Sequence, residues 1–422
     1  MKSNKSLVIS NTAAQMIGKF VSMSVTILAT TLIARTLGKA GYGQFTLIMQ
    51  FSAFFYILAD FGLNSVAARE IKSVQDRRDI LKNLAVLRLG ISLVLILIGF
   101  VALLFLPYNR LVSLGIILSL TTIITNSLTI TLNLYFQMTF QYAKAMISTI
   151  ISSTFLLIFI LWVYFTSPPD ALLMYVTGYV VAGLIMVLAS LVLFGKEINF
   201  LRSSVSRARM RELLILSLPL GLMFIFSQIH GKADVFLLSV LKLPDTSSLN
   251  RNETLGVYGL AYKIFEVVLV FSTFFMSATY PILLTKSENL KELYRTYRMI
   301  VLFLALIGLL SMGGIYVFAP AVISLLGGFG FQDSILILRL LGLGLPIFFV
   351  SSATQWFILA IRRERTLPII YAIGATITVL SNLILIPRYS YLSPAILTWM
   401  VEYLILLMMV GVVTKHYLSY VK

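Results

Sequence analysis

The amino-acid sequence predicts an all-α integral membrane protein with about twelve transmembrane helices, arranged as two six-helix lobes. Three observations carry this prediction. Of the 422 residues, 59% are hydrophobic and only 12% are charged, whereas soluble domains carry about 25% charged residues. Apolar runs of roughly 20 residues, the length that crosses a bilayer as a helix, follow one another along the whole chain. Two sequence patterns of the first half recur in the second half.

The apolar runs give the expected helices in chain order. They are far longer than the roughly 9–11 residues of a membrane β-strand and lack strict alternation, so helices are favoured over a barrel. The positive N-terminus resembles a signal peptide, but Lys19 interrupts its apolar part, and we expect a retained first span. The predicted spans are 7–34, 43–66, 84–106, 111–138, 145–166, 171–194, 213–240, 256–285, 299–326, 334–359, 367–386 and 391–414.

The loops between these spans predict the orientation. With a cytoplasmic N-terminus, 22 basic residues fall on the inner side and 6 on the outer side. An excess of Lys and Arg marks cytoplasmic loops. We therefore expect a multi-pass protein of the cytoplasmic (inner) membrane with both termini in the cytoplasm. The basic loop at 195–212 is interpreted as an orientation signal.

Two patterns recur between the halves. Gln-x-x-Gly-Lys ends at Lys19 and again at Lys232, and a Leu-Gly pair followed by Tyr-Gly occurs around Tyr42 and around Tyr258. The offsets, 213 for the first pattern and 216 for the second, are nearly equal. Six spans separate the copies, so both halves have the same orientation, as in transporters built from parallel repeats. We expect an N-lobe of residues 1–200 and a C-lobe of residues 201–422.

Composition and missing motifs exclude several classes of function. The net charge of +17 is spread over short loops and not over one face, which excludes a nucleic-acid partner. The chain has no Cys and two His, so we expect no metal site. Gly231-Lys232 is followed by Ala233 and lacks the upstream Gly of a Walker A loop. We expect no cofactor, no catalytic residues and no enzyme activity.

Ten ionisable residues lie within the predicted spans. A charge at the bilayer centre costs about 2.5–3.5 kcal/mol on insertion scales, so these residues are expected to face a protein cavity. The basic ones, candidate cations for an anionic substrate, are Lys19, Lys232, Lys263, Arg88 and Arg339. Three acidic ones, candidates for ion coupling or charge balance, are Asp60, Asp234 and Glu266. Glu402 has no assigned role, and His230 is interpreted as a polar packing residue.

Several of these residues have a second interpretation. Arg88 and Arg339 lie near span ends, from which their side chains could extend to the interface. Lys19 is about 18 Å into its span at 1.5 Å per residue, beyond that reach. Lys263 and Glu266 are three residues apart and can pair, as a working or as a structural pair.

The sequence resembles the polysaccharide-biosynthesis, O-antigen flippase (Wzx-like) branch of the multidrug/oligosaccharidyl-lipid/polysaccharide (MOP) exporter superfamily. The resemblance rests on the span number, the repeat and five stretches: Ala34-Arg35-Thr36-Leu37-Gly38, Gly41-Tyr42-Gly43-Gln44-Phe45, Asp60-Phe61-Gly62-Leu63 running to Arg69-Glu70, the segment 256–264, and Tyr280-Pro281.

This resemblance implies a carrier that moves a polyprenyl-pyrophosphate-linked oligosaccharide to the outer leaflet by alternating access. It also implies that the first, second, seventh and eighth helices border the cleft, which is where Lys19, Asp60, Lys232, Asp234, Lys263 and Glu266 fall. The matching Gln-x-x-Gly-Lys patterns and the depth of Lys19 predict that Lys19 and Lys232 together hold the pyrophosphate. The implied partners are the lipid-linked oligosaccharide, membrane lipids and other polysaccharide-assembly membrane proteins. An ion-coupled multidrug or organic-cation antiporter of the MATE type has the same number of spans and is the alternative. A membrane-embedded glycan polymerase or ligase is ranked lower because the outward loops are short.

Overall fold

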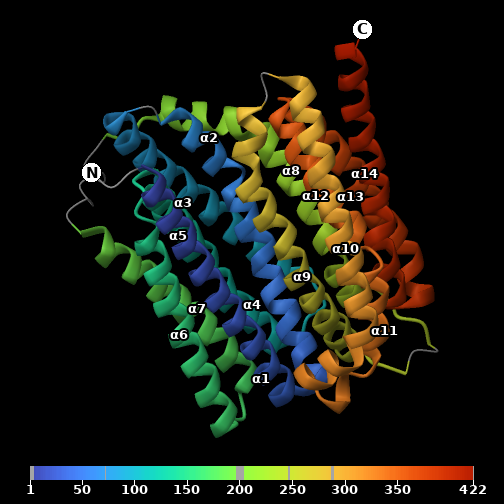
Figure 1. Ribbon diagram of the computed structural model, residues 1–422. Helices are drawn as coiled ribbons and strands as arrows, with labels where there is room; N and C mark the ends of the chain where they lie inside the picture. The colour runs from blue at the N-terminus through green and yellow to red at the C-terminus, as the bar shows by residue number, and fades with distance from the viewer. Residues whose placement is uncertain (1–3, 72, 196–203, 246–247, 287–288, 422) are drawn as a thin grey trace. The chain divides into compact units, whose positions relative to one another are not determined.

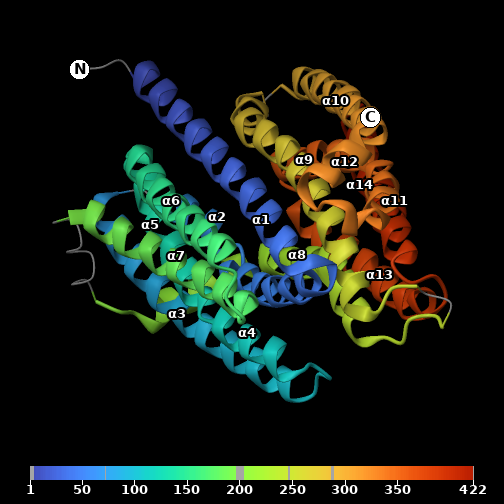
Figure 2. The same cartoon turned by 90° about the horizontal axis from the view of Figure 1, so that it is seen from below.

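A computed structural model describes residues 4–71, 73–195, 204–245, 248–286 and 289–421, and these residues form helices joined by short connections (Figures 1 and 2). Clustering of close backbone contacts divides the chain into two compact units. Unit 1 holds residues 1–37 and 45–221, and unit 2 holds residues 38–44 and 222–422. The all-α membrane fold predicted from the sequence is confirmed.

Unit 1 contains α1 and the helices that follow it in the first half of the chain. Their bounds are α1 Asn4–Asp60, α2 Leu63–Glu70, α3 Val74–Leu104, α4 Arg110–Leu120, α5 Thr122–Met138, α6 Tyr142–Thr166 and α7 Ala171–Phe194. Ser73 and Asn109 cap α3 and α4 by accepting hydrogen bonds from backbone N–H groups of the first turn. Leu63, Leu84, Phe136 and Leu213 contribute to one apolar core within this unit.

Unit 2 contains most of α8 and the remaining helices. Their bounds are α8 Arg207–Val240, α9 Arg251–Thr285, α10 Leu290–Leu326, α11 Asp333–Gly342, α12 Leu345–Ala360, α13 Leu367–Tyr389 and α14 Leu392–Val421. Asn250 and Glu253 form a reciprocal capping box at the start of α9. Helix α12 packs against α9, α10 and α14, and α13 packs against α14. These contacts bring together the helices α9, α12, α13 and α14, which carry many of the polar residues described below.

The helices correspond closely to the predicted spans. Within the described residues, ten helices are long and apolar enough to cross a membrane, and the pair α11 and α12, bent by 43° at Leu343–Gly344, adds an eleventh. The predicted first and second spans are joined in α1, which is interrupted at Gly38 by a backbone φ of 62°. The predicted loop at 35–42 is therefore a helix kink, because glycine adopts this conformation without steric cost.

The segment 38–44 belongs to unit 2 although its sequence lies in the first half. A Cβ added to Gly43 would lie 1.9 Å from the Asn252 backbone oxygen, and one added to Gly256 would lie 1.9 Å from the Lys39 backbone oxygen. Lys39 also pairs with Glu253 at 3.4 Å. The two copies of the Leu-Gly repeat thus cross here at backbone contact, which requires glycine at both positions.

The lobe boundary expected after residue 200 differs from the boundary between the compact units. Leu213 belongs to the core of unit 1, and unit 1 extends to Gly221 inside the continuous helix α8. A Cβ on Gly221 would contact the ring of Phe61, also in unit 1. The first turns of α8 therefore pack with the first half of the chain.

Candidate functional site

A cluster of two lysines and one glutamate joins α8 to α9 in unit 2. Lys232 donates a hydrogen bond to Glu266 Oε1, and Lys263 Nζ lies 3.6 Å from Glu266 Oε2. The Lys232 ammonium also lies 5.4 Å from the centre of the Tyr262 ring, within the range of a cation–π contact. The Glu266 carboxylate therefore pairs with two ammonium groups, and the cluster has one formal positive charge.

The cluster is partly open to its surroundings. The side chains of Lys232, Glu266 and Lys263 are 13%, 26% and 39% exposed. Lys is a point-charge donor for phosphate, so this cluster has the charge and the access that an anionic group requires. The expected pairing of Lys263 with Glu266 is present, and the same carboxylate also holds Lys232.

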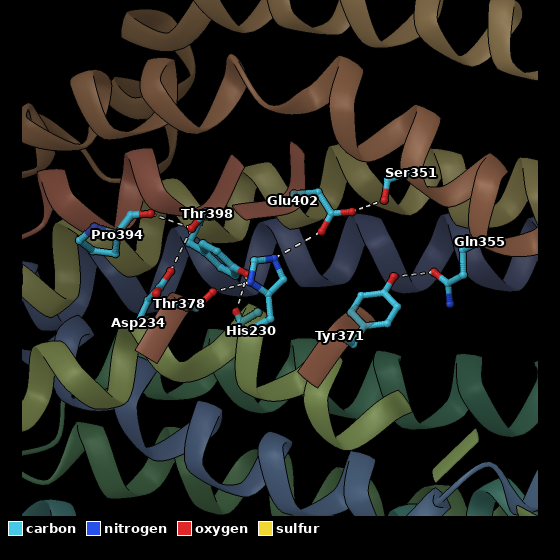
Figure 3. A network of polar contacts seen from close by, with 11 residues as sticks. His230, Asp234, Ser351, Gln355, Tyr371, Thr378, Pro394, Thr398 and Glu402 are labelled. Atoms are coloured by element: carbon cyan, nitrogen blue, oxygen red, sulfur yellow. Dashed lines mark hydrogen bonds and ion pairs between the residues drawn. The ribbon is translucent and has the colours of Figure 1, made fainter. Parts of the chain in front are cut away.

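Asp234 lies two residues beyond Lys232 on α8 and has a different environment. Its carboxylate accepts hydrogen bonds from the Tyr258 hydroxyl at 2.7 Å, the Thr398 hydroxyl at 3.0 Å and the Asn382 amide at 2.8 Å (Figure 3). The residue is 2% exposed. The described hydrogen-bond partners of Asp234 are neutral, so hydrogen bonds and not an ion pair hold this carboxyl group inside unit 2.

His230 and Glu402 form a second buried pair beside Asp234. His230 Nε2 lies 3.3 Å from Glu402 Oε2, and its Nδ1 lies 2.7 Å from the Thr378 hydroxyl (Figure 3). Glu402 Oε1 accepts a hydrogen bond from Ser351 on α12. His230 and Glu402 are 4% and 5% exposed. These contacts connect α8, α12, α13 and α14.

The polar contacts of this interior continue away from Asp234. The Tyr371 hydroxyl donates to Gln355 Oε1 at 3.0 Å (Figure 3). The Gln355 amide in turn contacts the Met223 sulfur at 3.8 Å. Hydrogen-bonding side chains therefore line the interior of unit 2 over several helical turns.

Arg88 and Asp60, two ionisable residues from the predicted spans of unit 1, form an ion pair. Arg88 on α3 bonds to Asp60 at the end of α1, to the Asn64 amide oxygen at 2.8 Å and to the Thr131 hydroxyl at 2.9 Å. Arg88 is 1% exposed and the Asp60 side chain is 25% exposed. Arg88 is thus buried inside unit 1, and it does not extend to the interface. Asp60 has the charge-balancing contact that was one of its two expected roles.

Arg339 is not a member of the Lys232–Glu266–Lys263 cluster, and Lys19 belongs to unit 1. Arg339 Nε donates to the Tyr316 backbone oxygen at 3.1 Å, and its guanidinium lies 4.9 Å from the Tyr316 ring. These contacts hold the end of α11 against α10. Lys19 lies on α1, but its side chain is outside the described part of the structure.

Sequence reasoning missed the uncharged members of the interior network. Thr378 and Asn382, and Ser351 and Gln355, each stand four residues apart on an apolar helix, and Thr398 stands four residues before the ionisable Glu402. Four-residue spacing places side chains on one face, one turn apart. Polar residues at this spacing within apolar spans could have indicated the network. They were not predicted because only ionisable residues were considered as candidates.

Comparison with known proteins gives one family and a set of similar folds. A model described as polysaccharide biosynthesis protein matches residues 8–287. The structure of the lipid II flippase MurJ in an inward closed conformation is similar with a TM-score of 0.74 and 16% identity, covering 94% of this chain and 87% of that one. Among curated protein sequences, none matches the chain closely enough to count as a relative.

Two further solved structures have the same fold. An inward-facing multidrug resistance MATE family transporter of the MOP superfamily has a TM-score of 0.72 at 16% identity, covering 94% of this chain and 95% of that one. A MOP superfamily transporter from Pyrococcus furiosus has a TM-score of 0.67 at 17% identity, covering 96% and 94%. At these identities the likeness establishes the fold.

Proposed function

Because the chain belongs to the polysaccharide biosynthesis protein family, we propose that it is a flippase for a polyprenyl-pyrophosphate-linked oligosaccharide. It moves this lipid from the inner to the outer leaflet of the cytoplasmic membrane by alternating access, and both termini lie in the cytoplasm. Other membrane proteins of polysaccharide assembly supply and consume the lipid. The chain itself acts as a carrier and makes or breaks no covalent bond.

The observation that carries this proposal is the excess positive charge of the Lys232–Glu266–Lys263 cluster. Two ammonium groups share one carboxylate, so one cationic charge is available to an anionic group. A pyrophosphate diester with about two negative charges needs such partners where water is scarce. Lys232 is the principal contact, since it also stacks on Tyr262 and is the less exposed lysine.

Lys19 is the second proposed contact for the pyrophosphate. It occupies the same place as Lys232 in the repeated Gln-x-x-Gly-Lys pattern. A second cation would match the second negative charge of the cargo. This part of the proposal rests on the repeat alone, and its test is separate from that of Lys232.

The buried Asp234 supports coupling of transport to a cation. Its described partners are a phenol, an amide and a hydroxyl, so the carboxylate is available to a small cation or a proton. Export energised by an ion gradient would use such a group. The Asp234→Asn variant, which keeps the shape and removes the charge, is expected to abolish the dependence of transport on the ion gradient.

Export in cells tests the role of the lysines. In a strain lacking the protein, the Lys232→Ala variant should restore surface glycan at least about tenfold less well than the wild type, because a charge-assisted contact contributes about 1.5–3 kcal/mol. Lys232→Arg should retain part of the activity, since its charge persists. Lys291→Ala, which removes an exposed lysine of α10, is the matched control and should export normally.

Normal export by the Lys19→Ala, Lys232→Ala double variant at wild-type protein level would contradict the proposed pyrophosphate site.

The MATE-type antiporter, the second candidate function, is favoured by the buried carboxylates Asp234 and Glu402. It predicts efflux of organic cations from vesicles and unchanged lipid-linked sugars in the deletion strain. Accumulation of lipid-linked oligosaccharide in that strain supports the flippase.

The orientation is tested with reporter fusions. A fusion after residue 203 and one after residue 422 should report the cytoplasm, and one near Ser248 should report the outer side. The expectation follows from the 22 basic residues on the inner side against 6 on the outer. An external signal after residue 203 would contradict the two parallel halves.

A further inference from the structure

Unit 1 has a buried aromatic group where α5 ends. Helix α5 packs against α3, α6 and α7, and the four helices lie together in Figure 2. The rings of Tyr135 and Phe136 on α5 contact the Phe194 ring on α7, with centroids 4.3 and 5.7 Å apart. Tyr135 and Phe136 are 6% and 0% exposed. Their ring faces are therefore turned toward protein groups and not toward solvent.

Two cations from neighbouring helices pack against these rings. The guanidinium carbon of Arg77 on α3 lies 5.3 Å from the centre of the Tyr135 ring. The Lys144 Nζ atom on α6 lies 6.0 Å from the centre of the Phe136 ring. Both distances fall in the range of cation–π contacts. Among the described residues, no carboxylate pairs with either cation, so the rings hold the two side chains without neutralising them.

The sequence around the two cations is basic. The first turns of α3 and α6, residues 73–82 and 141–146, contain four basic and two acidic residues. One of the acidic residues, Asp76, accepts a hydrogen bond from the Ser73 hydroxyl at 2.8 Å. This end of unit 1 therefore carries excess positive charge, which attracts an anionic group.

Two buried polar atoms beside the aromatic group lack a hydrogen-bond partner among the described residues. They are the donor Arg77 Nε and the acceptor Gln141 Oε1. The Gln141 backbone N–H donates to the Phe136 carbonyl at 2.8 Å, which places Gln141 next to the rings. Buried polar groups are nearly always hydrogen-bonded in folded proteins. A ligand with acceptor oxygens for the guanidinium and a hydroxyl for the amide would complete both.

The cluster lies at the level of the lipid headgroups. The two α5 rings belong to the last four residues of one predicted span, and Lys144 directly precedes the next predicted span, 145–166. From Lys144 the same face of α6 continues with Ile147 and Ile151, three and seven residues further on. These two side chains are 44% and 45% exposed. A cation at the interface followed by an exposed apolar face matches the headgroup and the acyl chain of a lipid.

We propose that Arg77 and Lys144 bind the phosphate of an anionic phospholipid, with its acyl chain along α6 and a headgroup hydroxyl donating to Gln141. Arginine binds phosphate oxygens through its fork of N–H donors, and lysine adds a point charge. Phosphatidylglycerol carries both the phosphate and the hydroxyls. With the orientation proposed above, this lipid belongs to the inner leaflet. It is a constituent of the membrane and not the cargo.

Native mass spectrometry of the full chain in detergent tests the site, with phosphatidylglycerol and phosphatidylcholine as the two probes. The wild type should bind the first phosphatidylglycerol at least about tenfold more tightly, because charge-assisted hydrogen bonds form only with the anionic lipid that the site fits. This comparison needs no variant to fold. Inorganic phosphate, added at the lipid concentration, should not displace the lipid. Displacement would assign the site to free phosphate and overturn the proposal.

Substitutions then locate the site. Arg77→Gln should weaken the binding of phosphatidylglycerol at least about tenfold and leave that of phosphatidylcholine unchanged. Lys144→Gln and Gln141→Leu should weaken it by less, since the guanidinium remains in place. Arg298→Gln is the matched control, because it removes an exposed arginine that directly precedes the predicted span 299–326 on the same predicted side. It should bind phosphatidylglycerol as the wild type does.

The outcomes are independent of the carrier function, because the titration contains no lipid-linked oligosaccharide. Equal wild-type affinities for the two lipids, or an unchanged affinity for phosphatidylglycerol in Arg77→Gln, overturn the lipid site whatever the protein transports. Equal losses in Arg77→Gln and Arg298→Gln also overturn it, because they indicate attraction by net charge alone. Selective loss in Arg77→Gln together with normal lipid-linked sugars in the deletion strain retains the lipid site and contradicts the flippase.

Discussion

The two units use their buried charges in different ways. In unit 1, Arg88 bonds to Asp60 and to two neutral groups, and the guanidinium is almost fully enclosed. In unit 2, Asp234 and Glu402 are enclosed without a described Lys or Arg partner, while Lys232 and Lys263 share a partly exposed carboxylate. Removing one partner of a buried ion pair leaves an unpaired charge and destabilises the protein, whereas an uncompensated charge remains available to a ligand. We therefore expect substitutions in unit 1 to change stability and those in unit 2 to change transport.

The largest expected effect on stability is that of Arg88→Leu. Breaking a buried ion pair costs about 3–5 kcal/mol, and the lower end applies because Asp60 is a quarter exposed. The unfolding free energy in detergent should therefore fall by about 3 kcal/mol, measured by denaturant or thermal unfolding. The double variant Asp60→Leu, Arg88→Leu should recover most of this loss, since no unpaired charge remains. A single variant as stable as the wild type would contradict a structural role for this pair.

Lys232→Met tests whether the Lys232 charge contributes more to transport than to stability. Glu266 keeps Lys263 at 3.6 Å, so the unfolding free energy should fall by only about 2 kcal/mol, the contribution of one charge-assisted hydrogen bond. Glycan export should nevertheless fall at least about tenfold, as for Lys232→Ala. Stability and export are measured on the same preparation. A destabilisation as large as that of Arg88→Leu would show that unit 2 also uses this charge structurally.

Lys263→Gln is expected to have a smaller effect than Lys232→Met. Its side chain is 39% exposed, and ion pairs of this kind contribute about 0–1 kcal/mol. Export should fall by less than in Lys232→Met, because the more buried lysine remains in place. An equal loss of export from both variants would show that the two ammonium groups contribute equally to the site.

Arg339→Gln should have the smallest effect. The guanidinium contacts the backbone and ring of Tyr316, and an exposed contact of this type contributes at most about 1 kcal/mol. Export by the variant should be close to that of the wild type in the complementation assay. Loss of export at normal protein level would support Arg339 as one of the substrate-binding cations predicted from the sequence.

The sequence predicted the helices well because the bilayer imposes a simple rule on them. Apolar runs of the required length correspond to helices from α3 to α14. The sequence did not predict the continuity of α1, because a Gly within a polar stretch is as compatible with a loop as with the observed kink at Gly38. The boundary between the units also differs, since the pattern of apolar residues does not say which neighbours the first turns of α8 contact.

For the candidate site, the sequence located the ionisable residues but not their partners. Lys263 and Glu266 could be paired because they are neighbours on one helix. The contacts of Arg88 with Asp60 and of His230 with Glu402 join residues 28 and 172 positions apart, and only the packing of the helices brings them together. The roles of Thr378 and Asn382 depend on the same packing.

Because of segment 38–44, the two halves of the chain cannot be exchanged as independent units. An N-terminal fragment ending near residue 200 would carry residues that complete the second unit, and a C-terminal fragment would lack them. Chimeras made by exchanging halves between relatives would have to keep both Gly43 and Gly256, because each glycine admits the backbone of the other copy. An exchange of halves is thus constrained at the contact between Gly43 and Gly256.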